Sequence, residues 1–179
     1  MAVTIETADL LLKKARMEDW RAIYQNLWCH AESARYMFWE VTVCEADAIA
    51  RMQRTLDFQK THEYALFIYE KKSGQAIGFA GMQELAPGVF EETGIALGPR
   101  FTGKGYGTQA LNALVQTARE LGAHRFNACC RRENLASHAL QMRCGFHFVG
   151  EEPRIDPRTG ETYKMEFNVK ELTEPEERL

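Results

Sequence analysis

The sequence predicts an α/β (α+β) fold with one mixed, mostly antiparallel central sheet and helices on both faces. Three observations predict it. Strand-like runs at residues 64–70, 75–82 and 89–97 follow one another with no helix between them, as in an antiparallel meander. A glycine-rich loop at 98–107 then leads into an amphipathic helix. Because that helix separates the runs at 89–97 and 125–130, these two strands should run parallel.

The chain length and composition indicate one soluble globular domain. At 179 residues, with 45% hydrophobic and 26% charged residues, the chain can bury a sizeable core, and we expect a single domain over residues 1–179. The net charge of −3 argues against nucleic acid as a partner. No apolar run is long enough for a membrane span, and the first residues do not resemble a signal peptide. We expect a cytoplasmic protein whose acidic tail, 171–179, is frayed.

The cysteines predict no disulfide framework. Their number is odd, and no C-x-x-C pair occurs among Cys29, Cys44, Cys129, Cys130 and Cys144. Free thiols in a reducing cytoplasm are the expected state. Cys129 and Cys130 are neighbours in a predicted strand and should point to opposite faces, so we expect no metal site.

The elements before the meander are predicted by periodicity. Residues 10–15 suit a first strand, and 17–28 carry apolar residues at helical spacing. Residues 31–41 are aromatic and irregular. The pair Thr42 and Glu45 has the spacing of a capping box, which predicts the start of a second helix running through Leu56.

The elements after the loop alternate between helix and strand. A helix is predicted to Leu121 with Gly122 ending it, followed by a strand at 125–130 and a short helix at 134–144. Residues 146–149 suit a strand, 156–160 a turn, and 163–169 alternate as a half-buried strand.

The glycine-rich loop predicts an anion site, because glycines expose backbone N–H groups at the positive end of a helix. A P-loop is disfavoured, since Gly105 occupies the position of its Ser or Thr. A dinucleotide fingerprint fits Gly105, Gly107 and Ala110, with Glu133 as the ribose-binding acid, but it requires a parallel sheet that the meander contradicts. A helix cap that binds nothing is the remaining alternative.

Two motifs carry a resemblance to a known family. Thr102-x-x-Gly105-x-Gly107 is similar to the [QR]-x-x-G-x-[GA] loop of the GNAT (GCN5-related) N-acetyltransferases, with Thr in place of Gln or Arg. Residues 133–137, Glu-Asn-Leu-Ala-Ser, followed by Cys-Gly-Phe at 144–146, resemble the N-x-x-S…G-F segment of the branch that acetylates ribosomal-protein N-termini (RimJ/RimL-like). The start at 7–12 is also similar to that branch, with Asp9 where Arg is usual.

The resemblance covers nearly the whole chain and implies the GNAT acyl-CoA N-acyltransferase fold. It implies that acetyl-CoA, the acetyl-donor substrate, lies between the two strands that flank the loop. The implied cofactor-binding residues are Ile95, Ala96, Leu97, Arg100, Thr102, Gly103, Lys104, Gly105, Tyr106, Gly107, Thr108, Asn134 and Ser137.

The resemblance also implies catalytic candidates, each with a plainer alternative. Glu92 matches the family's strand glutamate and is the first candidate for the base; Glu91 exchanges roles with it if a bulge shifts the strand. Asp156 is a second acid, or a plain turn residue. The position of the tyrosine acid used by many members is Gln141, so Ser137 is the candidate that assists the leaving thiolate, or it only binds the cofactor.

The expected function is acetyl transfer to a primary amine, either a protein N-terminus or a small molecule, by direct attack on the thioester. An acyl-CoA-binding module without catalysis and an NAD(P)-binding oxidoreductase are the alternatives. Many family members are homodimers, which the residues of this chain neither support nor oppose.

Overall fold

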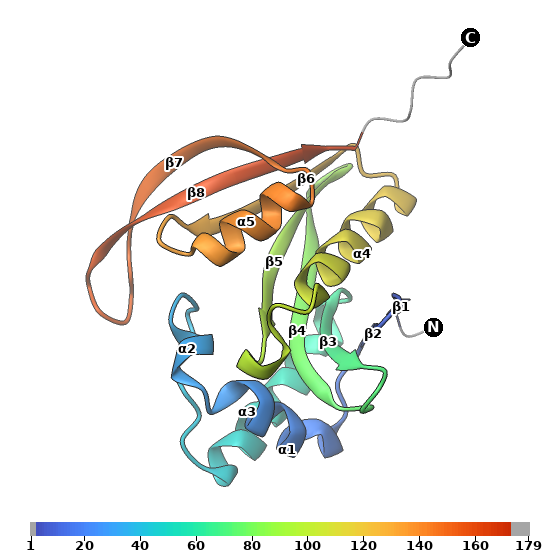
Figure 1. The fold of residues 1–179 in the computed structure, drawn as a ribbon, viewed down its shortest axis with the longest axis vertical. Coiled ribbons are helices and arrows are strands. Elements are labelled where there is room, and N and C mark those ends of the chain that lie inside the picture. Colours follow the sequence, from blue (N-terminus) through green and yellow to red (C-terminus); the bar gives the residue numbers. More distant parts are fainter. Residues whose placement is uncertain (1–2, 173–179) are drawn as a thin grey trace.

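The computed structural model describes residues 3–172, which form one eight-stranded sheet covered by helices (Figure 1). The strand order is β1-β2-β3-β4-β5-β6-β8-β7. The strands are β1 (Thr4–Glu6), β2 (Leu10–Lys13), β3 (Ala65–Glu70), β4 (Ala76–Ala86), β5 (Val89–Leu97), β6 (Arg125–Arg131), β7 (His147–Ile155) and β8 (Thr162–Glu171). The predicted acidic tail lies outside the described residues, apart from Glu171 and Leu172.

The sheet confirms the predicted mixed, mostly antiparallel architecture. Strands β1 to β5 form an antiparallel meander, and β6, β8 and β7 pair antiparallel as well. The parallel pair is β5 with β6, joined by a helical crossover as predicted. A doubly wound parallel sheet, which the dinucleotide alternative requires, is therefore excluded for these residues.

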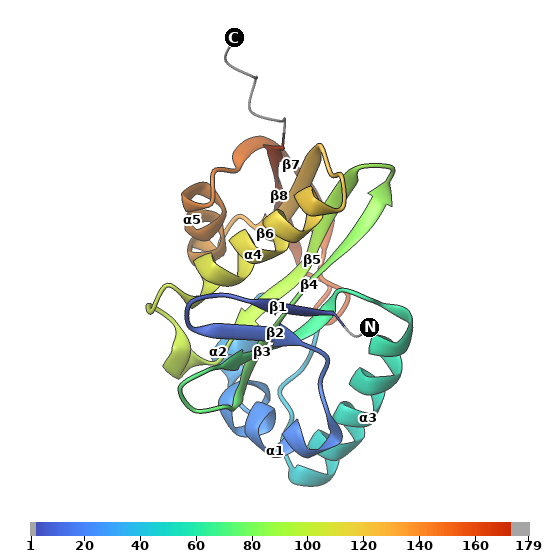
Figure 2. The same cartoon turned by 90° about the vertical axis from the view of Figure 1, so that its right-hand side faces the viewer.

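Helices cover both faces of the sheet (Figure 2). Alternation along β3 shows the two faces: Leu66 and Ile68 pack in a core with α4 (Tyr106–Glu120), whereas Phe67 and Tyr69 pack in a second core. That second core includes residues of α1 (Trp20–Ile23) and α3 (Glu45–Thr61). The remaining helices are α2 (Ala31–Ala34) and α5 (Leu135–Arg143).

The first predicted helix is wound in three ways. Residues 17–28 begin with a 3-10 turn, Met17–Asp19, continue as α1 and end in a π turn, η2 (Tyr24–Trp28). The amphipathic interpretation is confirmed, because Ile23, Leu27 and Trp28 are buried. Periodicity located the buried face but not the winding.

Several local predictions were wrong, among them the irregular segment 31–41, which contains α2, and the strand 75–82, which extends to Ala86 as β4. The pair Thr42 and Glu45 does not form a capping box: α3 begins at Glu45 with Cys44 as its N-cap, and the Thr42 hydroxyl accepts a hydrogen bond from Arg51 instead. Strand β1 was not predicted, and β7 extends to Ile155 rather than ending at 149.

Among residues 3–172, no helix has the length and apolar character needed to cross a bilayer.

Candidate active site

The candidate site lies where β5 and β6 diverge. These strands pair only over three positions, from Val89 with Arg125 to Glu91 with Asn127. Beyond that point β5 stays paired with β4 up to Leu97, and β6 stays paired with β8 up to Arg131. The facing edges of the two strands therefore lose their strand partners, and their free N–H and C=O groups are available to an amide-bearing ligand.

A pocket of about 680 Å³ occupies this divergence. It extends from the glycine-rich loop, past the amino end of α5, to the aromatic segment at 36–38. Most of the predicted site residues line it: Glu92, Ile95, Leu97, Thr102, Gly103, Gly105, Tyr106, Gly107, Thr108, Asn134 and Ser137.

The glycine-rich loop forms the cradle that its sequence predicts. Gly103 and Gly105 have φ values of 73° and 78°, which side-chain-bearing residues rarely adopt. Gly105 is the N-cap of α4 and supplies no side-chain hydrogen bond. The first N–H groups of α4 therefore keep their capacity to bind an anion, at the positive end of the helix dipole.

Four predicted site residues do not line this pocket. Arg100 and Lys104 are exposed, and the Lys104 ammonium lies 5.2 Å from the centre of the Phe101 ring. The Ala96 side chain is buried in the second core, although its backbone lies on the diverging strand. Asp156, the fourth, also lies away from the lining. Coenzyme contacts of the first three stay predictions.

Glu92 is the titratable side chain of β5 that faces the pocket. Burial, together with the neighbouring charge of Glu91, raises the pKa of its carboxyl to about 7, although a hydrogen bond from the Gly94 backbone opposes the shift. The predicted bulge occurs: Gly81 pairs with Gly94 and Met82 with Glu92, so Thr93 has no partner on β4. Glu92 nevertheless keeps the pocket side, while Glu91 accepts a hydrogen bond from Gln83.

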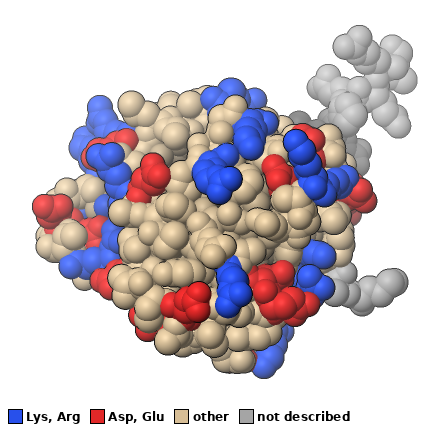
Figure 3. Space-filling model, turned by 60° about the horizontal axis from the view of Figure 1, so that its bottom comes forward, with Lys and Arg blue, Asp and Glu red and all other residues tan. Residues whose placement is uncertain are grey.

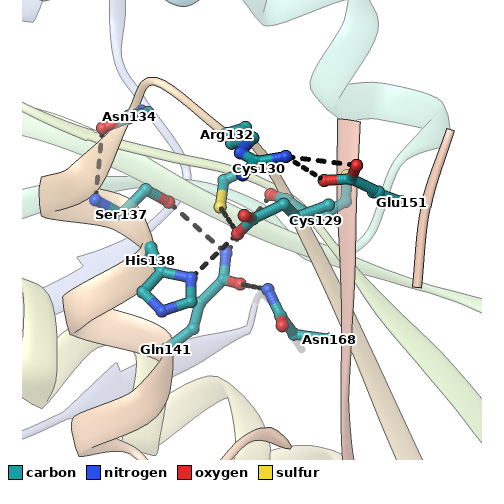
Figure 4. A network of polar contacts seen from close by, with 10 residues as sticks. Cys129, Cys130, Arg132, Asn134, Ser137, His138, Gln141, Glu151 and Asn168 are labelled. Atoms are coloured by element: carbon teal, nitrogen blue, oxygen red, sulfur yellow. Dashed lines mark hydrogen bonds and ion pairs between the residues drawn. The ribbon is translucent and has the colours of Figure 1, made fainter. Parts of the chain in front are cut away.

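Ser137 is held at the amino end of α5 by two hydrogen bonds (Figure 4). Asn134 caps the helix, and its Oδ1 accepts from the Ser137 backbone N–H at 3.2 Å. Gln141 donates from Nε2 to Ser137 Oγ at 3.3 Å and to the Cys129 carbonyl at 3.2 Å. The buried Gln141 also accepts from Asn168 across 2.6 Å. Sequence reasoning had noted Gln141 only as a missing tyrosine.

Cys130, His138 and Glu166 form a second polar cluster. Figure 4 shows Cys130 and His138 beside Ser137. His138 Nδ1 lies 2.8 Å from Glu166 Oε2, and the Cys130 thiol donates to the same oxygen at 4.0 Å. Cys129 is exposed and Cys130 is buried, and both line the pocket. Burial and the Glu166 charge raise the pKa of Cys130 to about 12, so its thiol is protonated at neutral pH. Sequence spacing could not identify this cluster, because its residues come from three different elements.

Asp156 is engaged by two arginines. Its carboxylate lies 2.6 Å from Arg131 Nη2 and 3.2 Å from Arg158 Nη2, and it is almost fully buried. Hydrogen bonds from Arg158 and then Arg131 hold its pKa well below the usual range. This arrangement favours the structural interpretation of Asp156 over that of a base. Arg158 also donates to the Trp39 carbonyl, which ties the 156–160 turn to the aromatic segment.

Charges of both signs are interspersed on the face shown in Figure 3, around a broad uncharged area. No large region of a single sign occupies that face. This agrees with the small net charge of the chain.

Comparison with known proteins identifies the family. A family model described as acetyltransferase (GNAT) domain matches residues 9–147. The L-methionine sulfoximine/L-methionine sulfone acetyltransferase of Pseudomonas aeruginosa is 28% identical over 124 residues, covering 66% of this chain and 72% of that protein.

Solved structures share the fold at low sequence identity. A GNAT-family acetyltransferase from Bacillus anthracis has a TM-score of 0.81 and 19% identity, covering 94% of this chain and 98% of its own. The microcin C7 self-immunity acetyltransferase MccE, in complex with acetyl-CoA and AMP, has a TM-score of 0.77 and 24% identity, with coverages of 93% and 94%. RimL, a ribosomal L7/L12 α-N-protein acetyltransferase in complex with coenzyme A, has a TM-score of 0.77 and 21% identity, with coverages of 94% and 98%.

Proposed function

This chain belongs to the GNAT family of acetyltransferases, and we propose that it transfers the acetyl group of acetyl-CoA to a primary amine by direct attack on the thioester. RimL is one of the structural neighbours of this chain, which agrees with the predicted RimJ/RimL-like branch. The relatives act on different acceptors according to their names, a methionine derivative in one and a ribosomal protein in another. They therefore leave the choice between a small molecule and a protein N-terminus open.

The observation that carries the proposal is the position of Glu92 in the same pocket as the uncapped amino end of α4. The loop glycines and the first turn of α4 would hold the pyrophosphate of the coenzyme through backbone N–H groups. The unpaired edge of β5, at Ile95 to Leu97, would bind the pantetheine amides. The thioester would then lie between β5 and β6, within the pocket that Glu92 also lines.

Glu92 is the proposed general base. A primary alkyl amine has a pKa near ~10 and is mostly protonated at neutral pH, so a proton must leave before attack. A carboxyl whose pKa is about 7 is half ionised at that pH and can accept this proton, directly or through water. The amine nitrogen then forms a bond to the acyl carbon, and a backbone N–H near Ala96 or Leu97 would stabilise the oxyanion.

Ser137 is the proposed donor to the leaving group. When the tetrahedral intermediate collapses, the C–S bond breaks and its electron pair stays on the coenzyme sulfur. Gln141 donates to Ser137 Oγ, so the serine O–H keeps its role as a donor; its neighbours are the Cys130 thiol and the pocket that Ser137 lines. The hydroxyl then donates a hydrogen bond to the thiolate, and the second proton that the amine nitrogen loses on becoming an amide passes to the sulfur to give CoA-SH.

A thermal-shift panel with acetyl-CoA, CoA, NAD(P)H and ATP–magnesium tests the donor. A ligand that binds the native state at a hundred times its dissociation constant adds about 2.7 kcal/mol to stability. We expect shifts with acetyl-CoA and CoA alone. A shift with NAD(P)H alone would contradict the proposal, and acetyl-CoA binding without transfer to any amine would favour a binding module without catalysis. The cytoplasmic location and a homodimer stay predictions.

A further inference from the structure

A second pocket, of about 360 Å³, lies between α3 and strands β3 to β5. Thr93 and Gly94 line both pockets, so the two pockets are neighbours at the bulge that follows Glu92. The lining of the second pocket is mostly apolar and includes the aromatic side chains of Trp28, Trp39, Phe58, Phe67 and Phe79. A ligand portion that enters it would be in contact with apolar surface over most of its area.

Arg51, on α3, is the one charged side chain in that lining. Its guanidinium carbon lies 4.5 Å from the centre of the Trp28 ring and 4.4 Å from that of Trp39. Nη1 donates to Thr42 Oγ1 at 3.0 Å and to the Glu40 carbonyl at 3.4 Å. Over residues 3–172, no carboxylate lies within ion-pair distance of Arg51, and its Nε and Nη2 donate to no protein acceptor.

Arg131, another arginine stacked on an aromatic ring, is paired with a carboxylate. Arg131 lies 4.0 Å from the centre of the Tyr163 ring, but it also binds Asp156 at 2.6 Å. Arg51 has the aromatic stacking without the anion. Partial burial of Arg51, with a smaller contribution from Arg54, lowers its pKa to about 10, which leaves it charged at neutral pH and insufficiently solvated.

Trp39 adds a second donor without a partner. Its indole N–H is buried and has no acceptor among the described residues. No acidic side chain lines the second pocket. The pocket therefore offers one positive charge, with the unpaired N–H donors of Arg51, within an apolar wall. A group that carries only acceptors and a negative charge, such as a carboxylate, complements it.

We propose that the second pocket receives the side chain and the carboxylate of the acceptor, and that Arg51 binds that carboxylate there. The acceptor is then a small amine that carries both a carboxylate and an apolar side chain, which is the class of free amino acids. This inference rests on the proposed function, because it assigns the acceptor of the same acetyl transfer. It makes Arg51 a specificity-determining residue.

Matched acceptors test the proposal. With saturating acetyl-CoA, kcat/KM is measured for L-leucine, L-methionine and L-phenylalanine, each against its α-carboxamide. We expect the Arg51→Met variant to lose about tenfold to a hundredfold in kcat/KM for the acids, the value of a charged hydrogen-bonded contact, and about twofold or less for the amides. Expressing each result as a ratio of variant to wild type cancels the different amine pKa values of acid and amide.

Two further variants separate charge from packing. Arg54→Met removes the same charge from an exposed position of α3 and should leave both ratios near one. Arg51→Lys keeps the charge and most of the stem, so it should retain part of the preference for acids. The proposal would be overturned if Arg51→Met lost the same factor in kcat/KM for acids and for amides. It would also be overturned if Arg54→Met lost as much in kcat/KM for the acids as Arg51→Met.

A binding measurement separates this proposal from the proposed function. 3-Phenylpropionate carries the carboxylate and the apolar group but no amine, and it is titrated calorimetrically into the CoA-bound protein. If no amine is acetylated, the proposed function fails, and Arg51-dependent binding of 3-phenylpropionate still supports the carboxylate site. Absence of binding to the wild-type protein, or binding unchanged in Arg51→Met, overturns it.

Discussion

Gln141 Nε2 donates a hydrogen bond to Ser137 Oγ across 3.3 Å, one helical turn further along α5. The same amide nitrogen donates to the Cys129 carbonyl, and its oxygen accepts from Asn168, so the amide orientation is fixed from three sides. Gln141 stands where the family resemblance places a tyrosine acid. Gln141 is buried and does not line the pocket. Its amide therefore positions Ser137 and does not donate a proton to a bound ligand.

Ser137→Ala should reduce kcat by about tenfold to a hundredfold, because the leaving thiolate loses a hydrogen-bond donor in the transition state. The KM for acetyl-CoA should change by about twofold or less, since the Asn134 cap and the backbone cradle stay in place. Steady-state kinetics of the variant test this. A large rise in KM with unchanged kcat would show that Ser137 only binds the coenzyme.

Glu92→Gln should reduce kcat/KM by about a hundredfold to ten-thousandfold through loss of the base. In the wild-type enzyme, kcat/KM should fall as pH decreases through about 7, because protonation removes the base form, and the variant should lack this step. Glu91→Gln is the matched control, because the Glu91 carboxyl accepts a hydrogen bond from Gln83 and does not line the pocket. A control variant as slow as Glu92→Gln would contradict the assignment.

The raised pKa of Glu92 also predicts how stability depends on pH. The usual value is 4.5 and the folded value is about 7, so the folded protein holds this proton more tightly than the unfolded chain. The Glu92 contribution is fully present below pH 4.5 and is lost as pH rises through about 7. The difference in unfolding free energy between Glu92→Gln and wild type should therefore change across that window, and a constant difference would contradict the raised pKa.

Gly105→Ala should raise the Kd of CoA by about tenfold, because the new Cβ projects beside the first N–H groups of α4 and disturbs one charge-assisted hydrogen bond. Its stability should fall by about 1 kcal/mol, since φ is 78°. Gly122→Ala is the matched control: φ is 88°, no atom lies within 4 Å of the added Cβ, and the position is at the other end of α4. It should lose similar stability and bind CoA normally.

Asp156→Asn should destabilise the protein more than Asp57→Asn does, because Asp156 is buried between two arginines whereas Asp57 pairs with Lys60 on the surface. The folded pKa of Asp156 is lowered, so its contribution is present above the unfolded value of 3.8 and is lost as pH falls below it. Thermal melting at pH 7 and pH 3 measures this. If Asp156 is instead a base, kcat should collapse while the melting temperature stays unchanged.

Local sequence determined the order of the elements and the location of the glycine-rich loop. Residues 89–97 were predicted as a strand and form β5 with those bounds, and the predicted helix to Leu121 matches α4 within one residue. These features depend on periodicity and on glycine, which act over a few residues. The family motifs in turn placed Glu92 and Ser137 on elements that the structure brings to one pocket.

Only the tertiary structure decided what surrounds those residues. The divergence of β5 from β6 arises because each strand remains paired with a different neighbour, and pairing partners are not encoded in local periodicity. Arg131, which pairs with Asp156, and the indoles around Arg51 come from other elements of the chain. Folding pairs the buried Asp156 carboxylate with arginines and leaves the Arg51 guanidinium without a carboxylate partner. These environments exist only after the chain has folded.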